Sequence, residues 1–195
     1  PQAQAPAAAA ALRRTVHLEQ EELQIRLSNQ WVQPHEEPDL WHWAKLTQVD
    51  PEPFRTVFAL PDLTGTGPVH VRMGFRGLSE INVFPPLPDK PADHLVEVRL
   101  NGELVRTATF EKRNEHTIEF ELPAGLLGAG ENTLELLVPK RSLPGAADAL
   151  VDVVMFDYIR LDYPIGGQLD DTPLPIQVAQ AGTVEIGRAS CRERV

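Results

Sequence analysis

The sequence predicts an all-β protein, an antiparallel β-sandwich of jelly-roll type with about eight strands. Three observations support this prediction. Apolar and polar residues alternate in several short runs, the 195 residues include 18 Pro and 13 Gly, and one Asn-Gly pair stands between two such runs. Alternation with a period of two is typical of strands with one buried and one solvated face. Frequent Pro and Gly favour turns over long helices.

The alternating runs are each about 5–8 residues long, as strands usually are, and Pro, Gly, Asn or Asp bounds them. We expect strands at 23–27, 54–60, 69–75, 118–122 and 134–138. The run 69–75 is the most regular, because Val, Val, Met and Phe alternate there with His, Arg and Gly. Such runs predict sheets with one face toward a core and one toward water.

A hairpin is expected at Asn101-Gly102, because both central residues of a type I′ turn need a positive φ angle. The flanking strands are then His94–Leu100 and Glu103–Phe110. The simplest register pairs Leu100 with Glu103, Val98 with Val105 and Glu97 with Arg106. The last pair would add a favourable contact between opposite charges across the strands.

The run Leu150–Tyr163 is long and apolar on both faces, which predicts a strand in the middle of a sheet. Asp157 stands between Met155 and Ile159 on an otherwise apolar face of this run. A buried carboxylate must be hydrogen-bonded, usually by backbone N–H groups of a neighbouring loop. We therefore expect a structural role for Asp157.

One segment breaks the strand pattern. Pro123 can begin a short helical turn, and Gly128 or Gly130 can end it. We expect one such turn between the strands at 118–122 and 134–138.

Both ends of the chain are expected to be disordered. Pro1–Ala11 consists only of Pro, Ala and Gln, with no apolar face to bury, so we assign residues 1–18 to a linker or frayed end and 19–164 to the sandwich. Residues 185–195 resemble a translated sequencing adapter in one reading frame, and we expect them to be non-native, as in a metagenomic fragment. They include Cys191, the one cysteine. The native part then has no disulfide framework and no cysteine metal site.

The charge balance bears on possible partners. The chain has 28 acidic residues against 18 basic ones, a formal charge of −10. Nucleic acids and anionic membranes bind clustered Lys and Arg, so neither is an expected partner. No apolar run approaches the ~20 residues of a membrane span.

Six segments, in order, match the pattern of a known domain: 39–43, 54–60, 74–79, 93–102, 126–134 and 154–164. The resemblance as a whole is taken to extend from Glu21 to Pro164, and Asp93-His94 followed by the Asn-Gly hairpin is its most specific piece. This series resembles the β-sandwich domain that precedes the catalytic domain in gingipain-type (family C25) cysteine peptidases. The arginine that usually follows Tyr-Pro in that pattern is Ile165 here.

The resemblance implies a galactose-binding-like sandwich in a secreted, multidomain bacterial protein, extracellular or periplasmic. The catalytic Cys–His pair would belong to a downstream domain, which is the implied partner, and residues 165–184 would connect to it. Peptidases of this type need a thiolate activated by a histidine. The fragment itself is therefore expected to be a non-catalytic accessory or structural module, with no catalytic residues and no cofactor.

An alternative function is saccharide binding. The Leu-Asn-Gly and Gly-x-Asn-x-Leu pieces also occur in carbohydrate-binding modules and in the C-terminal sandwich of rhamnogalacturonan lyases. Trp31, Trp41 and Trp43 could stack on sugar rings in such a module of a polysaccharide-degrading enzyme. Large rings in a sandwich more often pack in the core or against loops.

Metal binding was considered at two places. Asp93 and His94 could bind a metal together with Glu36 or Glu37, but a sheet histidine hydrogen-bonded to a loop is the commoner arrangement. A calcium site could draw on four acids, although they lack the spacing of a calcium loop and suit a solvated surface better: Asp148, Asp152, Asp170 and Asp171.

No Ser-His-Asp order, phosphate-binding loop or His-Glu-x-x-His motif occurs. Without a named nucleophile, the residues singled out are given structural roles: Asp93, His94, Asn101, Gly102 and Asp157.

Overall fold

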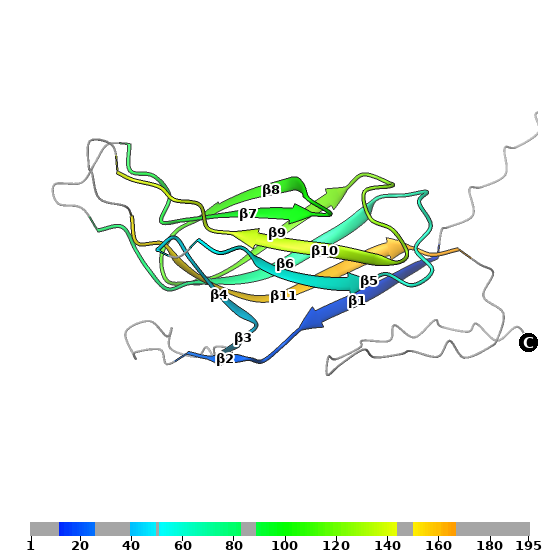
Figure 1. The fold of residues 1–195 in the computed structure, drawn as a ribbon, viewed down its shortest axis with the longest axis horizontal. Helices are drawn as coiled ribbons and strands as arrows, with labels where there is room; N and C mark the ends of the chain where they lie inside the picture. Colours follow the sequence, from blue (N-terminus) through cyan, green and yellow to red (C-terminus); the bar gives the residue numbers. More distant parts are fainter. Residues whose placement is uncertain (1–11, 26–39, 50, 83–88, 144–149, 167–195) are drawn as a thin grey trace, which may run out of the picture.

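The structure is a computed structural model, and it describes residues 12–25, 40–49, 51–82, 89–143 and 150–166. In these ranges every regular element is a β-strand (Figure 1). The strands form two antiparallel sheets that pack face to face, so the protein is the all-β jelly-roll sandwich that the alternation predicts.

The larger sheet has five strands around β11 (Val153–Pro164). Strand β6 (Val69–Gly77) lies on one side of β11, with β9 (Glu115–Leu122) beyond it. On the other side, β4 (Ala44–Thr47) pairs with the first part of β11 and β1 (Arg13–Glu19) with the second part. The predicted central position of the long apolar run is confirmed.

The second sheet has four strands in the order β5, β10, β7, β8. Their bounds are Phe54–Ala59, Glu131–Leu137, His94–Leu100 and Glu103–Phe110. A separate two-stranded sheet joins β2 (Leu23–Gln24) to β3 (Trp41–His42), below β4 in Figure 1.

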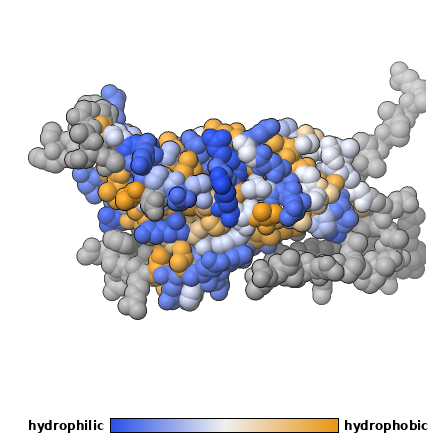
Figure 2. All heavy atoms as spheres, viewed as in Figure 1, coloured by the Kyte–Doolittle hydropathy of each residue, from blue (hydrophilic) through white to orange (hydrophobic). Residues whose placement is uncertain are grey.

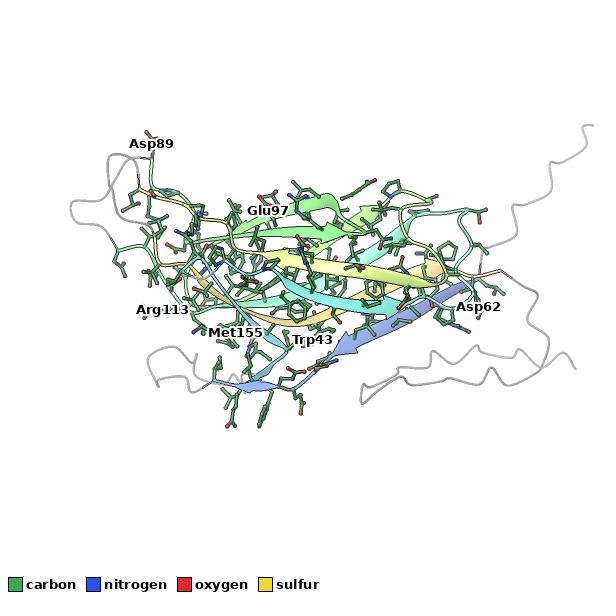
Figure 3. The ribbon with its side chains drawn as sticks, in the orientation of Figure 1. Trp43, Asp62, Asp89, Glu97, Arg113 and Met155 are labelled. Atoms are coloured by element: carbon green, nitrogen blue, oxygen red, sulfur yellow. The ribbon has the colours of Figure 1, made fainter. Side chains whose placement is uncertain are left out.

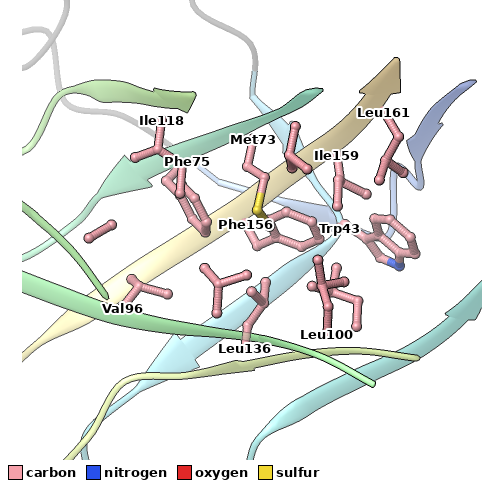
Figure 4. Packing of buried hydrophobic residues seen from close by; sticks show 14 of the residues in the cluster. Trp43, Met73, Phe75, Val96, Leu100, Ile118, Leu136, Phe156, Ile159 and Leu161 are labelled. Atoms are coloured by element: carbon pink, nitrogen blue, oxygen red, sulfur yellow. The ribbon is translucent and has the colours of Figure 1, made fainter. Parts of the chain in front are cut away.

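The core lies between the two large sheets (Figure 4). Phe156 of β11 is its centre, with ring centroids 5.4 Å from Trp43, 5.5 Å from Phe54 and 5.6 Å from Phe75. Alternation produces this core directly, since the residues of β6 at 69, 71, 73 and 75 are buried while those at 70 and 72 are exposed. Burial of each large side chain contributes about 1.5–3 kcal/mol.

The Asn-Gly hairpin is confirmed, with φ angles of 49° at Asn101 and 83° at Gly102. Leu100 pairs with Glu103 as predicted, but a β-bulge then shifts the register. Val98 therefore pairs with Arg106, and the predicted pairs Val98–Val105 and Glu97–Arg106 are wrong. The bulge turns Ala108 and Phe110 toward the core, where an unshifted register would have placed Thr107 and Thr109.

The N-terminal boundary also needs correction. Residues 13–18, which were assigned to a linker, belong to β1, whose seven residues all pair with β11. Val16 and Leu18 alternate with polar residues and pack against the core. This short alternating run at the end of the predicted linker is the reason that a strand forms there. Residues 1–11 and 167–195, including most of the proposed connector and the whole adapter-like tail, lie outside the described residues.

The predicted strand 23–27 is shorter in the structure. Only Leu23 and Gln24 form a strand, Leu23 is 41% exposed, and residues 26 and 27 lie outside the described ranges. The partner strand β3 has two residues, and a backbone hydrogen bond of 2.8 Å from the Ile25 N–H to the Leu40 carbonyl continues the pairing one step beyond them.

The predicted helical turn after Pro123 is wrong. The segment 123–130 is a loop with a positive φ of 89° at Gly125. The buried Asn132 side chain organises it, because its Oδ1 accepts from the Gly128 N–H and its Nδ2 donates to the carbonyls of Gly128 and Gly130. These bonds satisfy loop backbone groups that a helical turn would otherwise satisfy.

Candidate functional site

A group of ionisable residues, three of them buried, lies at the end of the sandwich where β7 and β11 begin. We call it the end cluster, and its members come from three segments far apart in the chain: Lys90, Asp93, His94, Arg141 and Asp152. Figure 3 labels Asp89 and Arg113, the chain neighbours of Lys90 and Lys112, at this end. Asp93 is 2% exposed, and His94 and Asp152 have no exposed surface.

The Asp152 carboxylate accepts hydrogen bonds on both oxygens. Its Oδ1 lies 2.7 Å from His94 Nδ1, and its Oδ2 accepts from the Leu95 N–H at 3.0 Å and from Arg141 Nη2 at 2.7 Å. Arg141 also donates to the backbone carbonyls of Ala92 and Asp93. Asp152 and Arg141 therefore attach the connection between β10 and β11 to the start of β7.

His94 is hydrogen-bonded on both ring nitrogens. Nδ1 faces Asp152, and Nε2 lies 3.0 Å from the backbone carbonyl oxygen of Lys112. Phe110 covers the ring with a centroid distance of 4.7 Å. Gly77 of β6 makes room for it, because a Cβ there would lie 2.3 Å from His94 Nε2. Every polar atom of the imidazole is thus in contact with protein.

Asp93 is held in a similar way. Its Oδ1 accepts from the Ile81 N–H at 2.8 Å and from Lys90 Nζ, and its Oδ2 accepts from the Lys112 N–H at 2.8 Å. Burial disfavours the ionised form, but the hydrogen bonds from Lys90 and from the two backbone N–H groups outweigh it. They hold the pKa of the Asp93 carboxyl well below its usual range.

We predict that Asp93→Asn lowers the free energy of unfolding at neutral pH by about 1–3 kcal/mol, because the amide presents N–H groups where donors already point. Since the folded-state pKa of Asp93 is depressed, its stabilising effect is present above the unfolded value of about 3.9 and is lost as the pH falls through the lower folded value. Urea unfolding of both proteins from neutral pH downward should show a shallower loss of stability in acid for the variant. An acid limb of equal steepness would contradict this role.

The His94–Asp152 pair has the contact distance of a catalytic His–Asp dyad. In such a dyad the second imidazole nitrogen faces a nucleophile or a substrate. Here the Lys112 carbonyl occupies that nitrogen, and neither side chain reaches solvent. The nearby Ser79 hydroxyl accepts from the Val153 N–H instead. The arrangement therefore suits fixing loops to strands and not proton transfer to a bound molecule.

The three tryptophans have different surroundings. Trp43 is 6% exposed and stacks on Phe156 in the core, so no sugar ring can reach its face in this structure. Trp41 of β3 is 40% exposed and pairs with Gln24 of β2, where the neighbouring Leu23 is also exposed. Trp31 lies outside the described residues. Of the predicted saccharide-stacking residues that the structure describes, Trp41 is the more exposed.

Asp157 lies at an irregularity of β11, where the register with β6 shifts between Phe156 and Ile159. This shift breaks the alternation between Met155 and Ile159, so the single apolar face predicted for Met155, Asp157 and Ile159 is wrong, and Asp157 is half-buried. The shift accommodates the Tyr158 ring, which lies over Gly74 of β6, where a Cβ would come within 2.4 Å of it. Backbone N–H groups donate to the carboxylates of Asp93 and Asp152.

The exposed face of the larger sheet contains a shallow groove of about 560 Å³ over β6, β9 and β11. Its charged residues pair across the strands, with His70 at 3.0 Å from Glu121 and Arg72 at 3.3 Å from Glu119. In the view of Figure 2, hydrophilic residues cover much of the surface, with apolar patches between them. Paired charges of both signs give the groove no preference for a ligand of one charge.

The sequence reasoning named Asp93 and His94 but missed their partners. Arg141 was not singled out, and Asp152 was considered only for calcium, although it precedes the apolar strand between two valines. An acidic residue inside an apolar run was the sequence signal that could have identified Asp152 as a buried carboxylate. Because Asp152 is buried against His94 and Arg141, it is not placed as a surface calcium ligand. Its proposed co-ligands Asp148, Asp170 and Asp171, like Glu36 and Glu37, lie outside the described residues.

Comparisons with known proteins show similarity of fold alone. No family model matches the chain, and no curated protein matches its sequence. Among solved structures, dimeric latent PorU from Porphyromonas gingivalis matches with a TM-score of 0.51 and 15% identity over 84% of this chain. The match covers 14% of the PorU chain, so this chain corresponds to a small part of that protein.

Two carbohydrate-binding modules also match. One is the CBM36-1 domain of a multidomain xylanase from the hindgut metagenome of Trinervitermes trinervoides, with a TM-score of 0.39 and 13% identity over 80% of this chain and 98% of that one. The other is a family 35 module from an environmental isolate, with a TM-score of 0.34 and 15% identity over 60% and 73%. Within the described ranges, no helix has the length and apolar character to cross a membrane.

Proposed function

We propose that this chain is a non-catalytic β-sandwich accessory module of a secreted, multidomain gingipain-like cysteine peptidase, extracellular or periplasmic. The observation that supports it most is the match of 84% of this chain to 14% of PorU, because there the same fold is one part of a far longer chain. The ordered sequence segments from Glu21 to Pro164 support the same parent independently.

The geometry supports a scaffold role for the module. The interior is filled by aromatic and aliphatic side chains around Phe156, and the buried charges of the end cluster bond to one another and to backbone groups. Side chains held in this way stabilise a surface on which another domain can dock. In this proposal the thiolate and histidine of the peptidase belong to the following domain.

Determining the coding sequence that follows residue 184 in its source DNA tests the parent. We expect an α/β domain with a His and a Cys placed after strand ends, as a cysteine peptidase requires. A coding region that stops near residue 185, or one that continues into a polysaccharide-degrading domain, would overturn the peptidase parent.

Saccharide binding is a second candidate function, favoured by one feature. The Trp41 side chain is 40% exposed on a two-stranded sheet that also exposes Leu23, and exposed indoles are side chains that stack on sugar rings. A glycan array in calcium buffer, probed with the full chain and with Trp41→Ala, tests it. Binding that the substitution abolishes would support this function, and an array without signal would reject it.

A further inference from the structure

The end cluster places a hydrogen-bond acceptor against each nitrogen of His94. The Asp152 carboxylate lies 2.7 Å from Nδ1, and the Lys112 carbonyl oxygen lies 3.0 Å from Nε2. A neutral imidazole has one N–H donor and one bare nitrogen, whereas the imidazolium ion has two donors. A neutral His94 has its bare ring nitrogen facing either the ionised Asp152 carboxylate or the Lys112 carbonyl. In both cases one of the two contacts would join two hydrogen-bond acceptors with no proton between them.

The other hydrogen bonds of Asp152 favour its ionised form. Its Oδ2 accepts from the Arg141 guanidinium at 2.7 Å and from the Leu95 N–H at 3.0 Å. A cation and a backbone donor on the same carboxylate stabilise the negative charge. The proton between Asp152 and His94 therefore belongs to the imidazole.

The charges around His94 agree with a cation at this place. Asp152 faces it from the segment before β11, and Asp93 precedes it in the chain. Arg141 and Lys90 are bound to these two carboxylates, and Lys90 also contacts Glu111. With an imidazolium at His94, three cations meet three anions.

Among the residues that the structure describes, three other neighbours of His94 are not anions. Gly77 of β6 packs against its edge, and Phe110 of β8 lies over its face. His116 of β9 stacks on the Phe110 ring, with centroids 4.6 Å apart. Burial, and next the neighbouring His94, lower the pKa of His116.

We propose that His94 is held as a doubly protonated imidazolium and that its second proton makes the stability of the folded chain dependent on pH. An unfolded chain has neutral histidines at pH 8, because their ordinary pKa is about 6.5. Unfolding then releases the second proton of His94. The folded state binds more protons than the unfolded state, so stability must decrease as the pH rises.

The direct test is side-chain NMR on the full chain labelled with ¹⁵N. Two-bond ¹H–¹⁵N correlation spectra at neutral pH report the protonation of both ring nitrogens. We expect both nitrogens of His94 to carry protons, while His116 shows the pattern of a neutral ring. A His94 with one bare nitrogen at neutral pH would overturn the proposal, and this test needs no variant that folds.

Urea unfolding at a series of pH values is the second test, on the wild type, His94→Gln and His116→Gln. From about pH 7 upward, the unfolding constant of the wild type should rise by up to about tenfold per pH unit while His94 keeps its proton. His116→Gln should keep this slope, and His94→Gln should lose it. A wild type without the slope, or a His94→Gln variant that retains it, would overturn the proposal.

Discussion

Asp152→Ala is expected to lower the free energy of unfolding by about 3–5 kcal/mol, the cost of removing one partner from a buried ion pair. Asp152 has no exposed surface, and its removal leaves Arg141, His94 and the Leu95 N–H without their shared acceptor. Urea unfolding followed by far-UV circular dichroism measures the loss.

Glu119→Ala is the matched control for this measurement. Glu119 also pairs with an arginine across a strand boundary, at 3.3 Å from Arg72, but both side chains are more than half exposed. A surface pair of this kind contributes about 0–1 kcal/mol. Equal losses in the two variants would show that the end cluster is not a buried ion-pair network.

Trp43→Ala is expected to cost about 3–5 kcal/mol, as large-to-small substitutions in a core do. The indole stacks on Phe156 at 5.4 Å and meets the edge of Phe54 at 5.5 Å, so its loss opens a cavity at the centre of the sandwich. Thermal or urea unfolding measures this effect. A loss below about 1 kcal/mol would contradict the core position, since most cavity-forming substitutions cost more.

Trp41→Ala is the matched control, because Trp41 is the same residue type two positions away but 40% exposed. Its cost should be about 1 kcal/mol or less, as for most exposed positions. The pair also separates two roles. Trp43→Ala should lower stability, whereas Trp41→Ala can lower saccharide binding while stability stays nearly unchanged.

The fold could be predicted from the sequence because its signals are local. Alternation in 69–75 and 134–138 identifies strands, and Asn101-Gly102 identifies the hairpin. The two register shifts could not be predicted. A bulge within β8 is decided by which of its residues reach the core, and that depends on the facing sheet, not on neighbours in the chain.

The candidate site was predictable only in part. Asp93 and His94 stand out beside the hairpin, but their partners are distant in sequence: Asp152 lies 58 positions after His94, and Arg141 lies 48 positions after Asp93. No periodicity connects such positions. The three tryptophans look alike in the sequence, and only packing distinguishes the buried Trp43 from the exposed Trp41.

The central claim is that the end cluster stabilises the end of the sandwich where β7 and β11 begin. Amide hydrogen exchange at Leu95 tests it most directly. The Leu95 N–H donates to the Asp152 carboxylate and not to a neighbouring strand, so its protection reports the cluster itself. We predict exchange as slow as that of Leu136 in the middle of the same sheet. Exchange as fast as at Gly102, in the exposed hairpin turn, would contradict the claim.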